Sequence, residues 1–185
     1  TVFVAGSIGA GVGVLSGYFG GVTDYLLIRL TEAFMALPFL IVALALAVVL
    51  RPSVTSLIVI LVFFGWAGYA RIIRSSVLQL RESDFIQLAK VAGCSSRRIL
   101  WRHVAPNILN TFVVLATLQV AVVILAEASL SFLGIGVPPP QPTWGSMLAD
   151  GRQFVSTAWW ISVFPGVAIT IVVLSVNVLG DWLRL

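Results

Sequence analysis

The side chains with the most chemistry to offer lie in one polar stretch, residues 71–107, which holds seven of the eleven Lys and Arg residues. Two of these, Arg98 and Arg102, are one helical turn apart, where like charges repel unless an acidic partner lies opposite them. Apolar side chains too numerous for an idle loop accompany the charges: Phe85, Ile99, Leu100, Trp101 and Val104. This mixture of basic and apolar side chains favours a surface that docks onto another protein, over a solvated basic loop or a helix lying on anionic lipid.

Catalytic chemistry finds little support in the rest of the chain. A membrane-embedded enzyme needs nucleophiles, acids or metal ligands gathered at one depth, and the sequence has no such group. His103 is the single histidine, which argues against a metal site, and Cys94, as the single cysteine, has no partner for an intramolecular disulfide. We therefore expect a protein without catalytic residues, metal or cofactor.

The composition indicates a membrane protein. Apolar residues make up 59% of the chain and charged residues 10%, whereas a soluble domain is about 25% charged. The net charge of +4 would suit nucleic acid if it were spread over a soluble surface. Because it is clustered in one stretch, it instead indicates orientation in a membrane, and no nucleic-acid partner is expected.

Five apolar runs reach, or nearly reach, the roughly 20 residues that a helix needs to cross a bilayer. We expect an all-α, polytopic membrane helix bundle with spans at 2–19, 33–50, 54–73, 108–133 and 158–181. In the first span Gly9, Gly13 and Gly17 share one helix face, which favours close packing against another helix. Pro38 is expected to kink the second span, and residues 134–157 to form a proline-rich external loop that contains a short helix.

The basic residues orient these spans. If residues 71–106 are cytoplasmic, alternation puts the connection 21–32 and the C-terminus on the same side, with nine basic residues inside. Only Arg51 and Arg152 then lie outside, so the positive-inside rule selects this topology. It also places Thr1 outside, which requires a further span upstream. The chain is thus expected to be a fragment, with five spans, of a subunit with at least six.

Residues 83–106 are expected to form a helix, a turn and a second helix, outside the membrane and between two spans. Ser83 can cap the first helix, Gly93 can end it with a positive φ, and Pro106 is expected to end the second. The first helix is amphipathic. Four of its residues share an apolar face: Phe85, Leu88, Ala89 and Ala92.

This loop resembles the cytoplasmic loop of permease subunits in bacterial ABC importers, whose pattern is E-A-A, three residues, G, nine residues, I, one residue, L-P. Three of its positions match, at Ala89, Gly93 and Pro106, and four depart, at Gln87, Leu88, His103 and Ala105. Longer segments are similar to one class, the C-type inner-membrane permease of dipeptide, oligopeptide and nickel importers. They are SGYFGGVTDYLLIRLTEAFMALP, RHVAPN, ILAEASLSFLGIGVPPPQPTWG and NVLGDWLR.

The resemblance implies a transport subunit with several partners in the bacterial inner membrane. These are a second, B-type permease, two ATP-binding subunits that dock on residues 83–106, and an external solute-binding protein. The chain has no G-x-x-x-x-G-K-[ST] motif, so it is expected not to be an enzyme and to take its energy from the partners. The coupling residues would be Phe85, Gln87, Leu88, Ala89, Gly93, Arg98, Arg102 and Pro106.

Glu127 is the only charged residue in the run 108–132. A charge within a span costs a few kcal/mol, so Glu127 should face the bundle interior or a wet cavity. It is either a polar contact near the translocation pathway or a packing contact with a neighbouring span. Peptides are the expected cargo, with a nickel importer next, and an ion-coupled secondary transporter is the alternative from another class.

Overall fold

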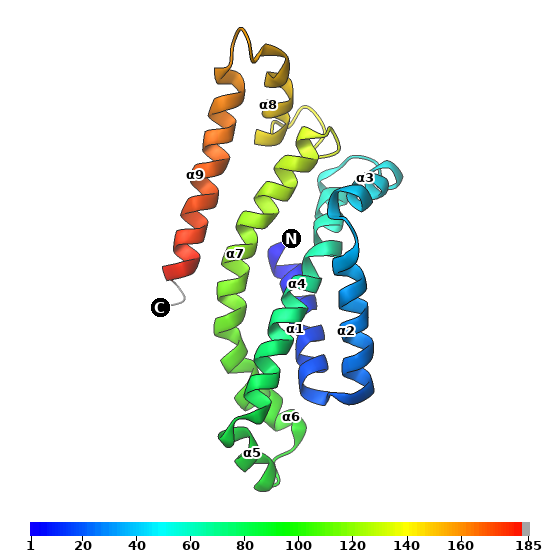
Figure 1. The fold of residues 1–185 in the computed structure, drawn as a ribbon, viewed down its shortest axis with the longest axis vertical. Coiled ribbons are helices and arrows are strands. Elements are labelled where there is room, and N and C mark those ends of the chain that lie inside the picture. Colours follow the sequence, from blue (N-terminus) through cyan, green and yellow to red (C-terminus); the bar gives the residue numbers. More distant parts are fainter. Residues whose placement is uncertain (183–185) are drawn as a thin grey trace.

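A computed structural model describes residues 1–182 as a bundle of α-helices, and no strand occurs in that part (Figure 1). A π-helical turn, Leu100–Val104, and a 3-10 turn, Arg152–Phe154, lie between some of these helices. The α-helices are α1 (Val2–Phe19), α2 (Gly21–Ala36), α3 (Phe39–Leu50), α4 (Val54–Glu82), α5 (Asp84–Val91), α6 (Ser96–Ile99), α7 (Ala105–Phe132), α8 (Trp144–Gly151) and α9 (Trp160–Trp182).

Four helices are long and apolar enough to cross a membrane: α1, α4, the continuous helix Ser96–Phe132, and α9. The number of membrane crossings rises to five if the bent pair α2 and α3 is counted as one crossing. Figure 1 shows α5 and α6 together at one end of the bundle and α8 with the proline-rich loop at the other. We call these the α5 end and the α8 end. The expected all-α membrane bundle is confirmed.

The close packing predicted for the glycine face of α1 is also confirmed, and α4 is its partner. A Cβ atom on Gly13 would lie 2.6 Å from the carbonyl oxygen of Ala70. Gly9 and Gly17 likewise meet α4 with too little room for any side chain. Gly11 lies off this face and has no atom within 4 Å of its Cβ position. The two backbones therefore touch along three successive turns, which only glycine permits.

The continuous helix predicted over 33–50 is wrong. The chain bends by 86° between α2 and α3, and α2 includes the whole segment 21–32 that was expected to be a connection. Pro38 is the cause, because it has no N–H to donate and it holds Leu37 in an extended conformation, with φ −73° and ψ 128°. The expected kink is a break.

The prediction that Pro106 ends a helix is wrong as well. The helix that begins at Ser96 continues past Pro106 to Phe132. Pro106 lies in the first turn of α7, directly after the π-helical turn, where the altered hydrogen-bond spacing accommodates a residue that lacks an N–H. The second half of the 83–106 loop is thus the rigid start of a long helix. By contrast, the short helix expected in the external loop is present as α8.

Candidate functional site

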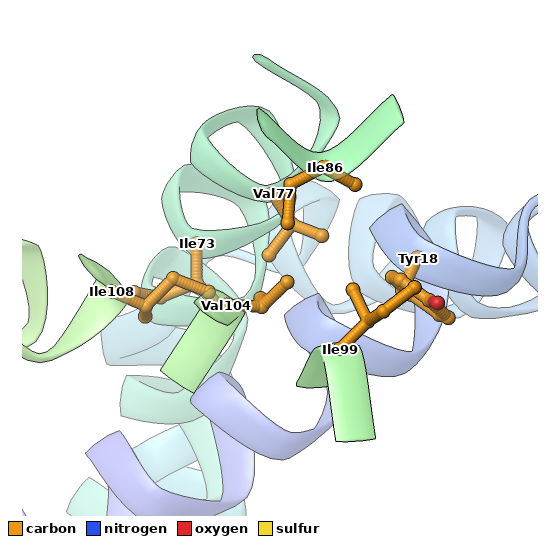
Figure 2. Close-up of a cluster of buried hydrophobic side chains, with 7 residues drawn as sticks. All are labelled: Tyr18, Ile73, Val77, Ile86, Ile99, Val104 and Ile108. Carbon is orange, nitrogen blue, oxygen red and sulfur yellow. The ribbon is translucent and has the colours of Figure 1, made fainter. Parts of the chain in front are cut away.

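At the α5 end, one side of α5 is fixed to the bundle by Ile86, which is fully buried. Figure 2 shows Ile86 directed towards Val77 of α4, beside side chains from α1, the α6 segment and α7. The sequence analysis missed Ile86, although its spacing of three from Ala89, which packs half-buried on the same cluster, could have revealed it. The cluster consists of Tyr18, Ile73, Val77, Ile86, Ile99, Val104 and Ile108.

The opposite side of α5 is exposed and apolar. Phe85, Leu88 and Ala92 of the predicted face lie here, and Leu88 is 67% exposed. Trp101, in the π-helical turn, is 73% exposed. The Phe85 ring lies 6.3 Å from the ring of His103, between centroids, so α5 and the turn form one continuous surface. We call it the docking surface: Phe85, Leu88, Val91, Ala92, Arg98, Trp101 and Arg102.

Cations border this apolar patch. Arg98 and Arg102 are exposed, and within residues 1–182 neither forms an ion pair with an acidic side chain. Gln87 turns away from the patch, because its Nε2 donates a hydrogen bond of 2.9 Å to the backbone oxygen of Arg81 near the end of α4. A glutamate at position 87 could not donate this bond. The polar part of the docking surface is therefore basic and unpaired within the described chain.

Gly93 ends α5 as predicted, with φ +76°. Its N–H donates to Lys90 O and the N–H of Cys94 to Ala89 O, each at 3.0 Å. Space is not the reason for glycine here, because no atom lies within 4 Å of the Cβ position. The requirement is the left-handed backbone alone. Ser83 occupies the cap position of α5, but its hydroxyl donates to Leu80 O instead of capping the helix.

An ion pair behind the docking surface joins three helices. Arg74 of α4 donates to both oxygens of Asp24 in α2, from Nε at 2.5 Å and from Nη2 at 2.6 Å. Ser16 of α1 donates a third hydrogen bond to Asp24. Two turns further along α4, Arg81 Nη1 reaches the backbone oxygens of the last α1 residues, 3.4 Å from that of Tyr18. This clamp fixes the α1–α2 corner to the part of α4 that leads into α5.

The strength of the clamp is measurable by a double-mutant cycle. We expect Asp24→Ala and Arg74→Ala to be non-additive, with a coupling free energy of about 1–3 kcal/mol, because the pair is bidentate and three-quarters buried. Thermal unfolding of the purified protein measures it. The control is the same cycle on Arg29 and Glu32, an exposed pair at 3.4 Å that should couple by less than about 0.5 kcal/mol. Equal coupling of the two pairs would contradict the assignment.

Glu127 lies at the α8 end, five residues before α7 ends at Phe132. It is partly buried, and it accepts a hydrogen bond of 2.6 Å from the Ser131 hydroxyl. Its side chain lines a cleft of about 370 Å³ whose other walls come from α8 and the loop before it: Pro142, Thr143, Trp144 and Met147. Within residues 1–182 no three His, Cys, Asp or Glu side chains are close enough to hold a metal ion.

Comparison with known proteins identifies the family of this chain. Residues 9–185 match the family described as binding-protein-dependent transport system inner membrane component. The chain belongs to this family. This membership confirms the family resemblance that the loop pattern and the longer segments carry.

Individual relatives are transport permeases. The chain is 45% identical to a putative peptide transport system permease protein of Brucella suis, over 96% of this chain and 63% of the relative. It is 39% identical to a dipeptide transport system permease protein of Alkalihalophilus pseudofirmus, over 95% of this chain and 58% of the relative. A glutathione transport system permease protein of Escherichia coli is 38% identical over 99% and 60%. The chain thus spans about three-fifths of their length.

The fold has a solved counterpart. An inward-facing structure of the MetNI methionine ABC transporter superimposes on 99% of this chain and 89% of its own, with a TM-score of 0.78 and 19% identity. At that identity the likeness establishes the fold, that of an ABC transporter membrane domain, and nothing about substrate.

Proposed function

We propose that this chain is the permease subunit of an ATP-driven importer of peptides, forming half of the translocation pathway. Its partners would be a second permease, two ATP-binding subunits and an external solute-binding protein. The observation that carries the proposal is the docking surface, an exposed apolar patch with unpaired cations, held rigidly on the bundle by Ile86. The names of the relatives, which cover peptides, a dipeptide and glutathione, support the cargo class.

The orientation follows from the same surface. We place the α5 end, with residues 71–106, and the C-terminus in the cytoplasm, where ATP is available, and the α8 end outside. Of the basic residues, only Arg51 and Arg152 then lie outside, in accord with the positive-inside rule. The residues assigned to coupling are Phe85, Gln87, Leu88, Ala89, Gly93, Arg98, Arg102 and Pro106.

Coupling can be followed through named contacts. Closure of the ATP-binding subunits would push on α5, which passes the movement to α4 and α7 through the buried cluster beneath Ile86. The Asp24–Arg74 clamp then makes the α1–α2 corner move with α4. Because the helix that begins at Ser96 is continuous to Phe132, a displacement at the docking surface can reach the Glu127 cleft at the other end.

The proposal is tested by charge reversal on the docking surface. Arg98→Glu together with Arg102→Glu should reduce co-purification of the ATP-binding subunits about five- to tenfold, because two attractive charges become repulsive. ATP-driven, vanadate-sensitive peptide uptake should fall with it. Arg152→Glu, an exposed arginine at the α8 end, is the matched control and should change neither. Full retention of the ATP-binding subunits by the double variant would refute the docking assignment.

A further inference from the structure

An acidic cleft at the α8 end is not explained by the docking surface. Its carboxylate, Glu127, makes one hydrogen bond, with Ser131. Among residues 1–182, its second oxygen accepts no hydrogen bond and no Lys or Arg forms an ion pair with it. A partly buried carboxylate without a counter-ion is costly, so a positive charge from outside the chain would stabilise it.

The walls of the cleft are rigid. A Cβ on Gly145 would clash with the backbone of Ala128, so the first turn of α8 lies directly against α7, next to Glu127. Thr143 and Ser146 form a reciprocal capping box, in which each side chain bonds the other's backbone N–H at 3.0–3.1 Å. The box and the contact together fix the backbone that carries Trp144, which lines the cleft. The backbone frame of the site is therefore formed before any ligand arrives.

The lining selects the kind of cation. A calcium or magnesium ion needs six or more oxygen ligands, and the cleft offers one carboxylate among mostly apolar walls. An organic ammonium group instead needs one carboxylate to accept its hydrogen bonds and an aromatic face for its charge, and Trp is the best such face. The lining contains one residue of each kind, Glu127 and Trp144, together with Met147, whose side chain is polarizable and apolar.

The size and surroundings of the cleft narrow the ligand further. The cleft is shallow and widely open, with a volume of about 370 Å³, so it can hold the end of a chain molecule while the rest stays outside. A larger cavity of about 520 Å³ adjoins it, shares Pro142 and Met147, and is lined by the proline-rich loop. An extended solute could place its end group at Glu127 and its body along that loop.

We propose that the Glu127–Trp144 cleft binds the free α-ammonium group of the transported peptide. The inference rests on the proposed function for the identity of the solute and deepens it by naming the group that is recognised. A basic side chain of the second permease is the competing occupant. The two occupants have different consequences. A basic side chain of the second permease would neutralise Glu127 permanently, so Glu127 would neither attract a cationic reagent nor bind a peptide.

Thiol labelling tests the cleft without requiring transport. Met147 is 42% exposed, so a Met147→Cys variant in a Cys94→Ser background places a reactive thiol in the wall. The complete importer in membranes is treated with methanethiosulfonates that carry either a trimethylammonium or a sulfonate group. We expect the ratio of cationic to anionic labelling rates to be about thirtyfold higher than in the same variant that also carries Glu127→Gln, because roughly 1 kcal/mol of attraction speeds the cationic reagent and an equal repulsion slows the anionic one. Glutamine keeps the size and can still accept from Ser131.

Protection by peptides identifies the ligand group. At saturating concentration, dialanine should slow the labelling at least twofold, whereas N-acetyl-dialanine, which lacks the ammonium charge, should not. Glu127→Gln should abolish the protection. A rate ratio that is the same with and without the Glu127→Gln substitution would overturn the proposal and indicate a resident cation. Equal protection by both peptides, or by neither, would also overturn it.

The two proposals can fail separately. If charge reversal at the docking surface leaves the ATP-binding subunits bound, the docking assignment that carries the proposed function fails whatever the labelling shows. If uptake is driven by ATP and yet acetylation of the peptide does not alter protection, the cleft assignment fails and the importer assignment stands.

Discussion

Gly13→Val is expected to lower the melting temperature of the purified protein by about 6–12 °C, which corresponds to roughly 3 kcal/mol for a chain of this size. Gly13 sits against the α4 backbone, where an added Cβ would lie 2.6 Å from Ala70 O and 3.0 Å from Arg74 N. Backbone atoms cannot rotate away as a side chain can. The helices must therefore separate, and the close contact on which α1 and α4 depend is lost along its length.

Gly11→Val is the matched control on the same helix. It makes the same change in propensity and size two residues away, at a position with no atom within 4 Å of the Cβ. We expect its melting temperature to stay within about 3 °C of that of the unmodified protein, because valine forms helix at least as well as glycine and its Cβ meets no atom here. Equal losses for the two variants would mean that valine harms α1 by itself and that the α4 contact is unimportant. The measurement is thermal unfolding in detergent, followed by the loss of monodisperse protein.

Part of this contact could be predicted from the sequence and part could not. Glycines repeated every four residues mark a face that another helix approaches, because in lipid close packing is the main use for such a face. The partner helix α4 is marked less clearly, because, of its two glycines, Gly65 approaches Ala5 of α1 and Gly68 has no atom within 4 Å of its Cβ position. It contributes the carbonyl groups of Trp66 and Ala70, and backbone atoms are the same in every sequence. The choice of α4 is therefore visible only in the structure.

The prediction for residues 21–50 was wrong for a different reason. Asp24, Arg29 and Glu32 marked it as a polar connection, yet all three lie within α2. The charge of Asp24 is satisfied by Arg74, 50 residues away in the chain, and local reading of a sequence has no access to such a pair. Apolar composition likewise does not indicate the direction of the helix axis, so the apolar run that contains Pro38 did not reveal a bend of 86°.

Helix α5 was predicted in outline, but the side chain that anchors it to the bundle was missed. Its amphipathic character and its end at Gly93 were correct. The apolar face with Phe85 and Leu88 was identified, but a second apolar side with Ile86 at its centre is the one that packs inward. An eight-residue helix with apolar residues on two sides has no unique inner face until the bundle is present. In the folded bundle the Ile86 side is buried, and the face with Phe85 and Leu88 remains exposed for a partner.

Gly93→Val is expected to reduce ATP-driven peptide uptake ten- to hundredfold, measured in proteoliposomes with the complete importer. A β-branched residue at φ +76° is strained by about 1–3 kcal/mol, and the turn relieves the strain by rearranging. The turn sets the angle between α5 and the helix that begins at Ser96, so the two halves of the docking surface no longer match a single partner face. Gly93 itself is exposed and its Cβ position is empty, so the melting temperature should change far less than the uptake.

Gly93→Asn separates backbone strain from side-chain size. Asparagine and valine are similar in volume, but asparagine adopts left-handed backbone far more readily. The Cβ of either residue enters open space, so neither meets a steric barrier within the chain. Uptake by Gly93→Asn should therefore stay within about threefold of the unmodified importer while Gly93→Val loses it. If the two variants lose uptake equally, the partner subunit requires empty space at residue 93. The turn would then be a contact point and would not set the shape of the docking surface.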